Sequence, residues 1–131
     1  QYVAHSADNL EITLGDPFIS EEIGRSYVYF PISVENKGVG RTKYVRRAGD
    51  KFQLKLNNSR VIIPRNLIED RVLELDSHQR LADSVNFDYA EFGDCEVFQL
   101  EAEICGQTYK KLFHKSQIQY EVKPLRRMSN G

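Results

Sequence analysis

The most regular alternation of apolar and polar residues in the sequence lies between residues 27 and 35. Every second side chain there is apolar, in the order Val28, Phe30, Ile32 and Val34. A period of two places these side chains on one side of an extended chain, which predicts a half-buried β-strand. Asn36 and Gly38 tolerate positive φ, so we expect the chain to turn there and pair the strand with a neighbour. One strand cannot bury its apolar side alone, so the rest of the chain must supply strands that cover it.

The same period recurs along the chain and predicts further short strands. The predicted strands lie at residues 10–14, 25–35, 52–56, 61–63, 72–75, 85–89, 96–104, 108–113 and 118–122. Pro31 has no N–H for a ladder, which indicates an edge position or a bulge in its strand. We interpret residues 18–24 and 76–83 as connections and residues 39–48 as a basic loop or irregular strand. Residues 65–71 could form one helical turn at most.

Eight or nine short strands, with turn signals about every ten residues and no persuasive helix, predict an all-β fold. We expect a two-sheet antiparallel β-sandwich, with its sheets packed face to face. A small closed barrel has the same pattern and stays open as an alternative. The 131 residues are enough for a single domain, in which residues 1–9 and 124–131 are expected to be loosely held. No apolar run approaches the roughly 20 residues of a membrane-spanning helix.

Several stretches follow one another in an order known from a group of bacterial domains. They are Val34-Glu35-Asn36-Lys37-Gly38 at a strand end, Phe52-Gln53-Leu54-Lys55-Leu56, and Leu73-Glu74-Leu75 with a polar loop into Ser84-Val85-Asn86-Phe87-Asp88-Tyr89. Over about residues 10–113 the chain thereby resembles the immunoglobulin-like, or telokin-like, domains of bacterial secreted proteins and lipoproteins. It departs from them at residues 76–82, where the family usually has a glycine. The resemblance implies an immunoglobulin-like sandwich with a binding or structural role, and transfers no site residues.

The net charge of -1 conceals an uneven distribution along the chain. Residues 37–65 contain nine basic residues and one acid, Asp50, for a net charge of +8, whereas residues 66–105 contain eleven acids and two arginines, for a net charge of -9. If strands from the two segments lie side by side, their charges mostly cancel across the sheet. That self-complementary arrangement is the interpretation we favour, because surface charge alone is a weak sign of function.

The two cysteines, Cys95 and Cys105, flank the predicted strand at residues 96–104. Ten steps of about 3.3 Å separate them by roughly 33 Å in a straight strand, whereas a disulfide needs Cα atoms within about 7 Å. We therefore expect no bond between them, and their spacing places both on the partly exposed side of the strand. Reduced thiols favour a cytoplasmic location, while the family resemblance favours the cell envelope or secretion. A bond to another chain or a redox role is the alternative for either thiol.

Residue spacing predicts no catalytic centre, metal site or cofactor. His5, His78 and His114 match no metal-ligand spacing. Asp76, Ser77 and His78 are adjacent in sequence, but a catalytic triad requires convergent geometry rather than adjacency.

The basic segment from residue 41 to residue 55 is the stretch with candidate ligand-binding residues. They are Arg41, Lys43, Tyr44, Arg46, Arg47, Lys51 and Lys55. Basic side chains can neutralise phosphates while an interleaved aromatic ring stacks on a base or sugar. The pI of about 6.4 counts against this interpretation, because nucleic-acid-binding domains are typically basic.

Three functions follow from these observations, in decreasing order of support. The first is a non-enzymatic module that binds another protein or has a structural role in a larger assembly, through loops or a sheet edge. The second is a domain that binds a polyanion, nucleic acid or glycan, through residues 41–55. The third is an enzyme whose site is assembled from residues distant in sequence. The identity of the partner and the oligomeric state stay open. Because the chain begins at Gln1 without a methionine, we expect that an upstream segment precedes it in the gene.

Overall fold

The structure is a computed structural model that describes residues 9–46, 52–57, 59–65 and 70–121. These residues form eleven strands and two short 3-10 helices. The strands are β1 Leu10–Leu14, β2 Phe18–Glu22, β3 Arg25–Asn36, β4 Thr42–Arg46, β5 Phe52–Leu56, β6 Val61–Ile62, β7 Arg71–Leu75, β8 Arg80–Asp88, β9 Val97–Ile104, β10 Gln107–His114 and β11 Gln119–Tyr120. The 3-10 helices are η1 Tyr89–Phe92 and η2 Lys115–Gln117.

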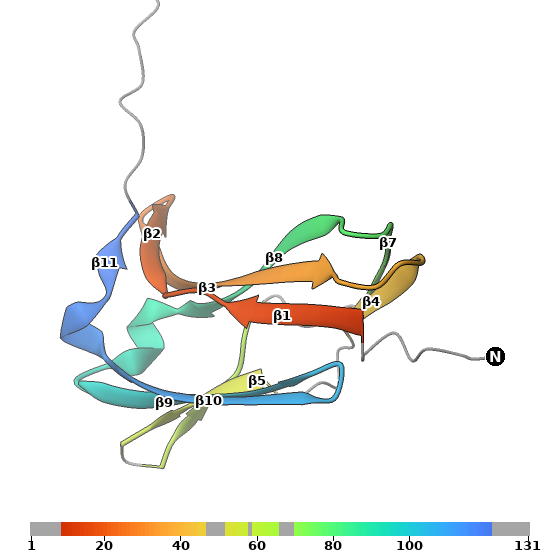
Figure 1. The fold of residues 1–131 in the computed structure, drawn as a ribbon. Helices are drawn as coiled ribbons and strands as arrows, with labels where there is room; N and C mark the ends of the chain where they lie inside the picture. Colours follow the sequence, from red (N-terminus) through yellow and green to blue (C-terminus); the bar gives the residue numbers. More distant parts are fainter. Residues whose placement is uncertain (1–8, 47–51, 58, 66–69, 122–131) are drawn as a thin grey trace, which may run out of the picture.

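The strands form two layers, which confirms the prediction of an all-β sandwich (Figure 1). In the first layer β3 pairs with β8 on one side and with β1 and β2 on the other, and β11 adds to β2 as a parallel strand. The second layer has the order β10-β9-β5-β6. Strands β4 and β7 form a separate ribbon at one end. The sheets do not join into one ring among the described residues, so the closed-barrel alternative does not apply to them.

The core lies between the two layers and is built on the apolar side of β3. Val28, Phe30 and Val34 are completely buried, as their alternation predicts. The ring of Phe30 packs edge-on against Phe87 of the same sheet at 5.6 Å and against Phe113 of the facing sheet at 5.5 Å. Burying a side chain of this size contributes roughly 1.5–3 kcal/mol, so these contacts are what holds the layers together.

Pro31 lies in the central strand β3. The ladder on its N–H side is interrupted between β1 and β2. Leu14 pairs with Ile32 and Phe18 pairs with Tyr29, so three residues between β1 and β2 lie opposite two residues of β3. The carbonyl of Pro31 accepts a hydrogen bond from Gly15 N at this break. Because the N and O of one residue in an antiparallel strand face the same neighbour, the missing N–H of Pro31 faces the break. Of the two predicted alternatives, the edge position was therefore wrong, and the expected bulge lies in the chain beside β3 rather than in β3 itself.

Several predicted boundaries also need correction. Residues 18–22, predicted as a connection, form β2, because the open side of β3 offers them a ladder and Ile19 reaches the core. Strand β8 begins at Arg80, inside the predicted polar loop, and residues 42–46 of the basic segment form a regular strand, β4. The β5–β6 hairpin is confirmed by the pairing of Leu54 with Ile62. The possible helical turn at residues 65–71 falls largely on residues 66–69, which lie outside the described residues. So do residues 1–8 and 124–131 of the expected loose ends.

Asn36 holds the end of β3 to the turn between β7 and β8. Its side chain is fully buried, and Nδ2 lies 2.7 Å from the carbonyl of Gly40 and 3.1 Å from the carbonyls of Leu75 and Asp76. Its Oδ1 accepts from Gly38 N at 2.9 Å, an Asx turn. Neither Asn36 nor Gly38 has positive φ, so the expected reason for the turn was wrong.

The expected pairing after this turn is also wrong, because β4 pairs with β7 instead of β3. At Gly38 space, rather than φ, opposes a side chain. A Cβ there would lie 3.0 Å from Cγ of Asn9 and 3.3 Å from Oδ1 of Asn36. The turn therefore depends on a buried amide and on the absence of a side chain two residues later.

We predict that Asn36→Ala lowers the free energy of unfolding by about 2–4 kcal/mol, because buried carbonyls lose their donor. Urea denaturation of the variant and the parent measures this loss. Ser33→Ala, an exposed position on the same strand, is the matched control and should change stability by less than about 0.5 kcal/mol. Equal effects of the two substitutions would contradict the structural role of Asn36.

Candidate functional site

The structure separates the residues that the sequence suggested as an anion site. Tyr44 is completely buried and Arg46 is 3% exposed, so neither can meet a ligand at the surface. Arg41 and Lys43 are exposed near or on β4, whereas Lys55 lies on β5 in another sheet. Arg47 and Lys51 lie outside the described residues. The described members therefore do not form one binding surface.

The opposite charges of the two segments meet across paired strands. Residues of the basic segment form ion pairs with the acidic one, namely Arg41 with Glu74 and Asp76, Arg46 with Asp83, Lys55 with Glu101 and Arg60 with Glu91. The pairs of Arg41 and Lys55 follow from the pairing of strands, since β4 lies beside β7 and β5 beside β9. The pair of Arg46 and Asp83 joins β4 to β8, which are not neighbours in a sheet. The self-complementary arrangement expected from the sequence is thus present.

Asp83 is the centre of a buried polar cluster where the β4–β7 ribbon meets β8. Its Oδ2 accepts from Tyr44 Oη at 3.0 Å and from Arg46 Nε at 2.9 Å. Its Oδ1 accepts from Arg71 Nη1 at 2.9 Å and from Ser84 N at 2.8 Å. Burial by itself raises the pKa of Asp83, but the hydrogen bond and charge of Arg46 and the N–H of Ser84 outweigh it, so the pKa lies below its usual range.

This cluster is suited to holding the ribbon in place and not to catalysis. A carboxylate with four donors has no lone pair left for a substrate proton, and burial together with Asp83 raises the pKa of Tyr44. Sequence analysis missed Asp83. The sequence contained one indication: Asp83 is two residues from Val85 and four from Phe87, so it shares the core-facing side of the strand with them.

The edges of the two sheets lie close together along β1 and β10, and the β1 edge is covered. Gln107 Nε2 donates to the carbonyl of Leu10 at 3.1 Å, and Tyr109 Oη donates to the carbonyl of Ile12 at 2.9 Å. Side chains of β10 thus occupy acceptor groups that β1 would otherwise offer to another strand.

The outer edge of β10 is not paired with any strand of the described part. Cys105 and Gly106, the two turn residues between β9 and β10, have φ of 50° and 79°, as in a type I′ hairpin. In such a ladder alternate residues bond the neighbouring strand, and the bond from Lys115 N to Glu96 O continues it in the same phase. The N–H and C=O groups of Thr108, Lys110 and Leu112 therefore point away from β9.

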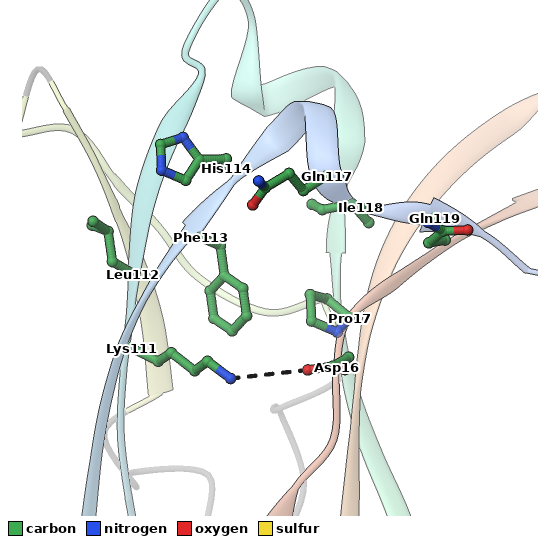
Figure 2. A pocket seen from close by; sticks show the side chains of 9 residues that line it. All are labelled: Asp16, Pro17, Lys111, Leu112, Phe113, His114, Gln117, Ile118 and Gln119. Carbon is green, nitrogen blue, oxygen red and sulfur yellow. Dashed lines mark ion pairs between the residues drawn. The ribbon is translucent and has the colours of Figure 1, made fainter.

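Two hollows lie along this edge, between β10 and the junction of β1 and β2. The larger, of about 390 Å³, is shown in Figure 2: Lys111 reaches toward Asp16, and the ring of Phe113 points toward Pro17. The smaller, of about 290 Å³, lies between Leu14 and Tyr109. Residues 108–114 of β10 line one or both of them. The edge thus combines open backbone groups with hollows for side chains.

The charge in these hollows comes mainly from Lys111. Its Nζ lies 3.9 Å from a carboxylate oxygen of Asp16 and 5.3 Å from the centre of the Phe113 ring. The side chains of Lys111 and Asp16 are 65% and 93% exposed, so water screens their ion pair and it is weak. The site offers a cation beside an aromatic floor and contains no nucleophile with a base beside it.

The cysteines are not bonded to each other, as predicted, but their environments differ from the expectation for Cys95. Cys95 is buried because β9 begins only at Val97, so the alternation of the strand does not extend to it. Its Sγ donates to the carbonyl of Val97 at 2.9 Å. Cys105 is half-buried in the hairpin turn, with its Sγ 3.3 Å from the carbonyl of Val45.

The histidines lie apart: His78 is in the β7–β8 turn, His114 ends β10, and His5 lies outside the described residues. Within the described ranges, no three histidine, cysteine or acidic side chains gather in a way that could hold a metal ion. In the same ranges there is also no helix with the length and hydrophobicity needed to cross a bilayer.

Asp83→Asn is predicted to cost about 3 kcal/mol of unfolding free energy at pH 7, because it leaves Arg46 buried without a counter-charge. The pKa of Asp83 is lowered in the folded state, so its contribution is present above about pH 4 and is lost as the pH falls through the folded-state pKa. The stability difference between parent and variant should therefore shrink below about pH 4 in denaturant titrations. Asp16→Asn, at an exposed carboxylate, should show no such difference. A constant gap between parent and Asp83→Asn down to pH 2 would contradict the assignment.

The chain was compared with protein-family models, with curated proteins and with solved structures, and none of the three comparisons returned a match. The immunoglobulin-like relationship inferred from the sequence therefore stays a prediction.

Proposed function

We propose that this domain is a non-enzymatic binding module that takes up an extended segment of another protein along the outer edge of β10. The observation that carries the proposal is the combination at this edge of unpaired backbone groups with two adjacent hollows. In strand addition of this kind, main-chain hydrogen bonds supply affinity and pockets for alternate side chains supply selectivity. Each added bond contributes roughly 0.5–1.5 kcal/mol.

Other edges of the sheets are less suited to this role. The edge of β1 is occupied by Gln107 and Tyr109. Strand β8 is longer than β10, but Arg65 crosses its outer side, where Arg65 N donates to the carbonyl of Asn86 at 2.9 Å. Strands β6 and β11 have two residues each. Strand β10 offers eight residues in regular extended conformation.

We propose further that the domain is located in the cell envelope. The sequence resembles domains of secreted proteins and lipoproteins, and recognition of another protein is compatible with that location. The binding mode itself does not depend on the compartment.

A substitution that removes one outward N–H tests the binding mode. We predict that Leu112→Pro weakens binding of peptides selected from a random displayed library by at least about fivefold, since the N–H of Leu112 points away from β9 and proline is tolerated at such edge positions. Fluorescence anisotropy with labelled peptides measures the affinity, and thermal unfolding verifies the fold.

Leu112→Ala is the matched control, because it removes the same exposed side chain and keeps the N–H. It should bind at least about threefold more tightly than Leu112→Pro. Equal affinities of Leu112→Pro and the parent, or a library from which no peptide is enriched, would contradict the proposed function.

A further inference from the structure

The charged side chains on the outer edge of β10 are basic. Residues 107–115 contain Lys110, Lys111, His114 and Lys115 and no acid. Lys110 and Lys111 are adjacent, so one lies on the outer face of the sheet and the other on the side of the hollows. A strand added here would meet a lysine on each of its faces.

The ion pair between Lys111 and Asp16 shows what kind of group this side of the edge accepts. Asp16 precedes β2 and reaches Lys111 across the opening of the larger hollow (Figure 2). The pair is exposed on both sides and thus weak. A carboxylate from an incoming segment can take the place of Asp16 with little loss.

Two other occupants fit the charge poorly. Pairing of this edge with the same edge of a second copy would bring Lys110 and Lys111 of both copies together, and like charges opposite one another are destabilising. The C-terminal residues 122–131 of the chain contain Lys123, Arg126 and Arg127 and no acid, so their charge has the same sign as that of the edge.

Resting on the proposed function, we infer that the preferred partner is an acidic extended segment of about seven residues, with apolar side chains and one carboxylate on the face toward the hollows and carboxylates on the opposite face. Its apolar side chains enter the hollows beside Tyr109 and Phe113, whose walls include Leu14, Pro17 and Ile118. Its carboxylates meet Lys110 on the outer face and Lys111 at the hollows. The lysines thereby both discourage pairing with neutral or basic edges and select an acidic one.

Binding of two designed peptides that differ in charge alone tests the inference. One is Thr-Val-Glu-Glu-Glu-Val-Thr, in which one face has two valines and a glutamate and the other face has two glutamates, and the other has glutamine in place of each glutamate. At about 50 mM salt the acidic peptide should bind about five- to tenfold more tightly, and the ratio should shrink at about 300 mM salt, where screening is stronger.

Variants locate the effect on the protein. The double variant Lys110→Gln, Lys111→Gln should remove the preference, so that the affinities of the two peptides lie within about twofold of each other, whereas Asp16→Asn should raise the affinity of the acidic peptide about two- to threefold. Lys43→Gln, at an exposed lysine of β4, is the matched control and should change neither affinity.

The possible failures can be told apart. If both peptides bind equally and Leu112→Pro weakens both, the proposed function stands and the acidic preference is refuted. If neither peptide binds at millimolar concentration, and the library also yields none, both proposals are refuted. A preference that the double variant retains would refute the assignment to Lys110 and Lys111.

Discussion

The pairing of backbone N–H and C=O groups on both sides of β3 organises this domain. Strand β3 is bonded to β8 along one side and to β1 and β2 along the other. Its apolar face can then be buried only by a second layer, and the ring of Phe113 in that layer contacts Phe30 of β3. Among the described residues, this central pairing leaves the outer strands as the places where backbone groups stay open. What the domain can bind therefore depends on whether the backbone groups of each outer strand are covered or open.

The two neighbouring outer edges are treated differently. On β1, polar side chains from β10 bond the carbonyls of Leu10 and Ile12. On β10 the protection consists of charge, since Lys110 and Lys111 lie on the two faces of the strand. Lysines on an edge oppose association with other edges, but they also attract a segment of opposite charge. Protection against aggregation and selection of an acidic partner are therefore two consequences of the same residues.

Two buried polar side chains fix the part of the fold that apolar packing leaves undetermined. Asn36 connects the end of β3 to the β7–β8 turn, and Asp83 connects β8 to the β4–β7 ribbon. Both residues are buried, so loss of either side chain would leave its partners without these hydrogen bonds. These contacts hold the ribbon at one end of the sandwich.

The sequence was sufficient for the fold class, because the alternation through Val28, Phe30 and Val34 survives in the structure without change. It was insufficient for β2, because a single core-facing apolar residue, Ile19, gives no alternation to recognise. This strand forms because β3 provides backbone groups for it to pair with. The candidate anion site failed as a surface for a related reason: Tyr44 and Arg46 occupy inward positions that only the location of Asp83 explains. The β10 edge could not be predicted, since local pattern identifies a strand but not which of its sides remains unpaired.

Amide hydrogen exchange along β10, followed residue by residue by NMR, tests the central claim most directly. We expect the exchange rates in the unbound domain to alternate along the strand. The outward N–H groups, those of Thr108, Lys110 and Leu112, should exchange at least roughly tenfold faster than the inward ones, those of Tyr109, Lys111 and Phe113. Addition of an acidic extended peptide should slow the first group and leave the second unchanged. Uniform protection along the strand in the unbound domain, or slowing confined to residues away from β10, would contradict it.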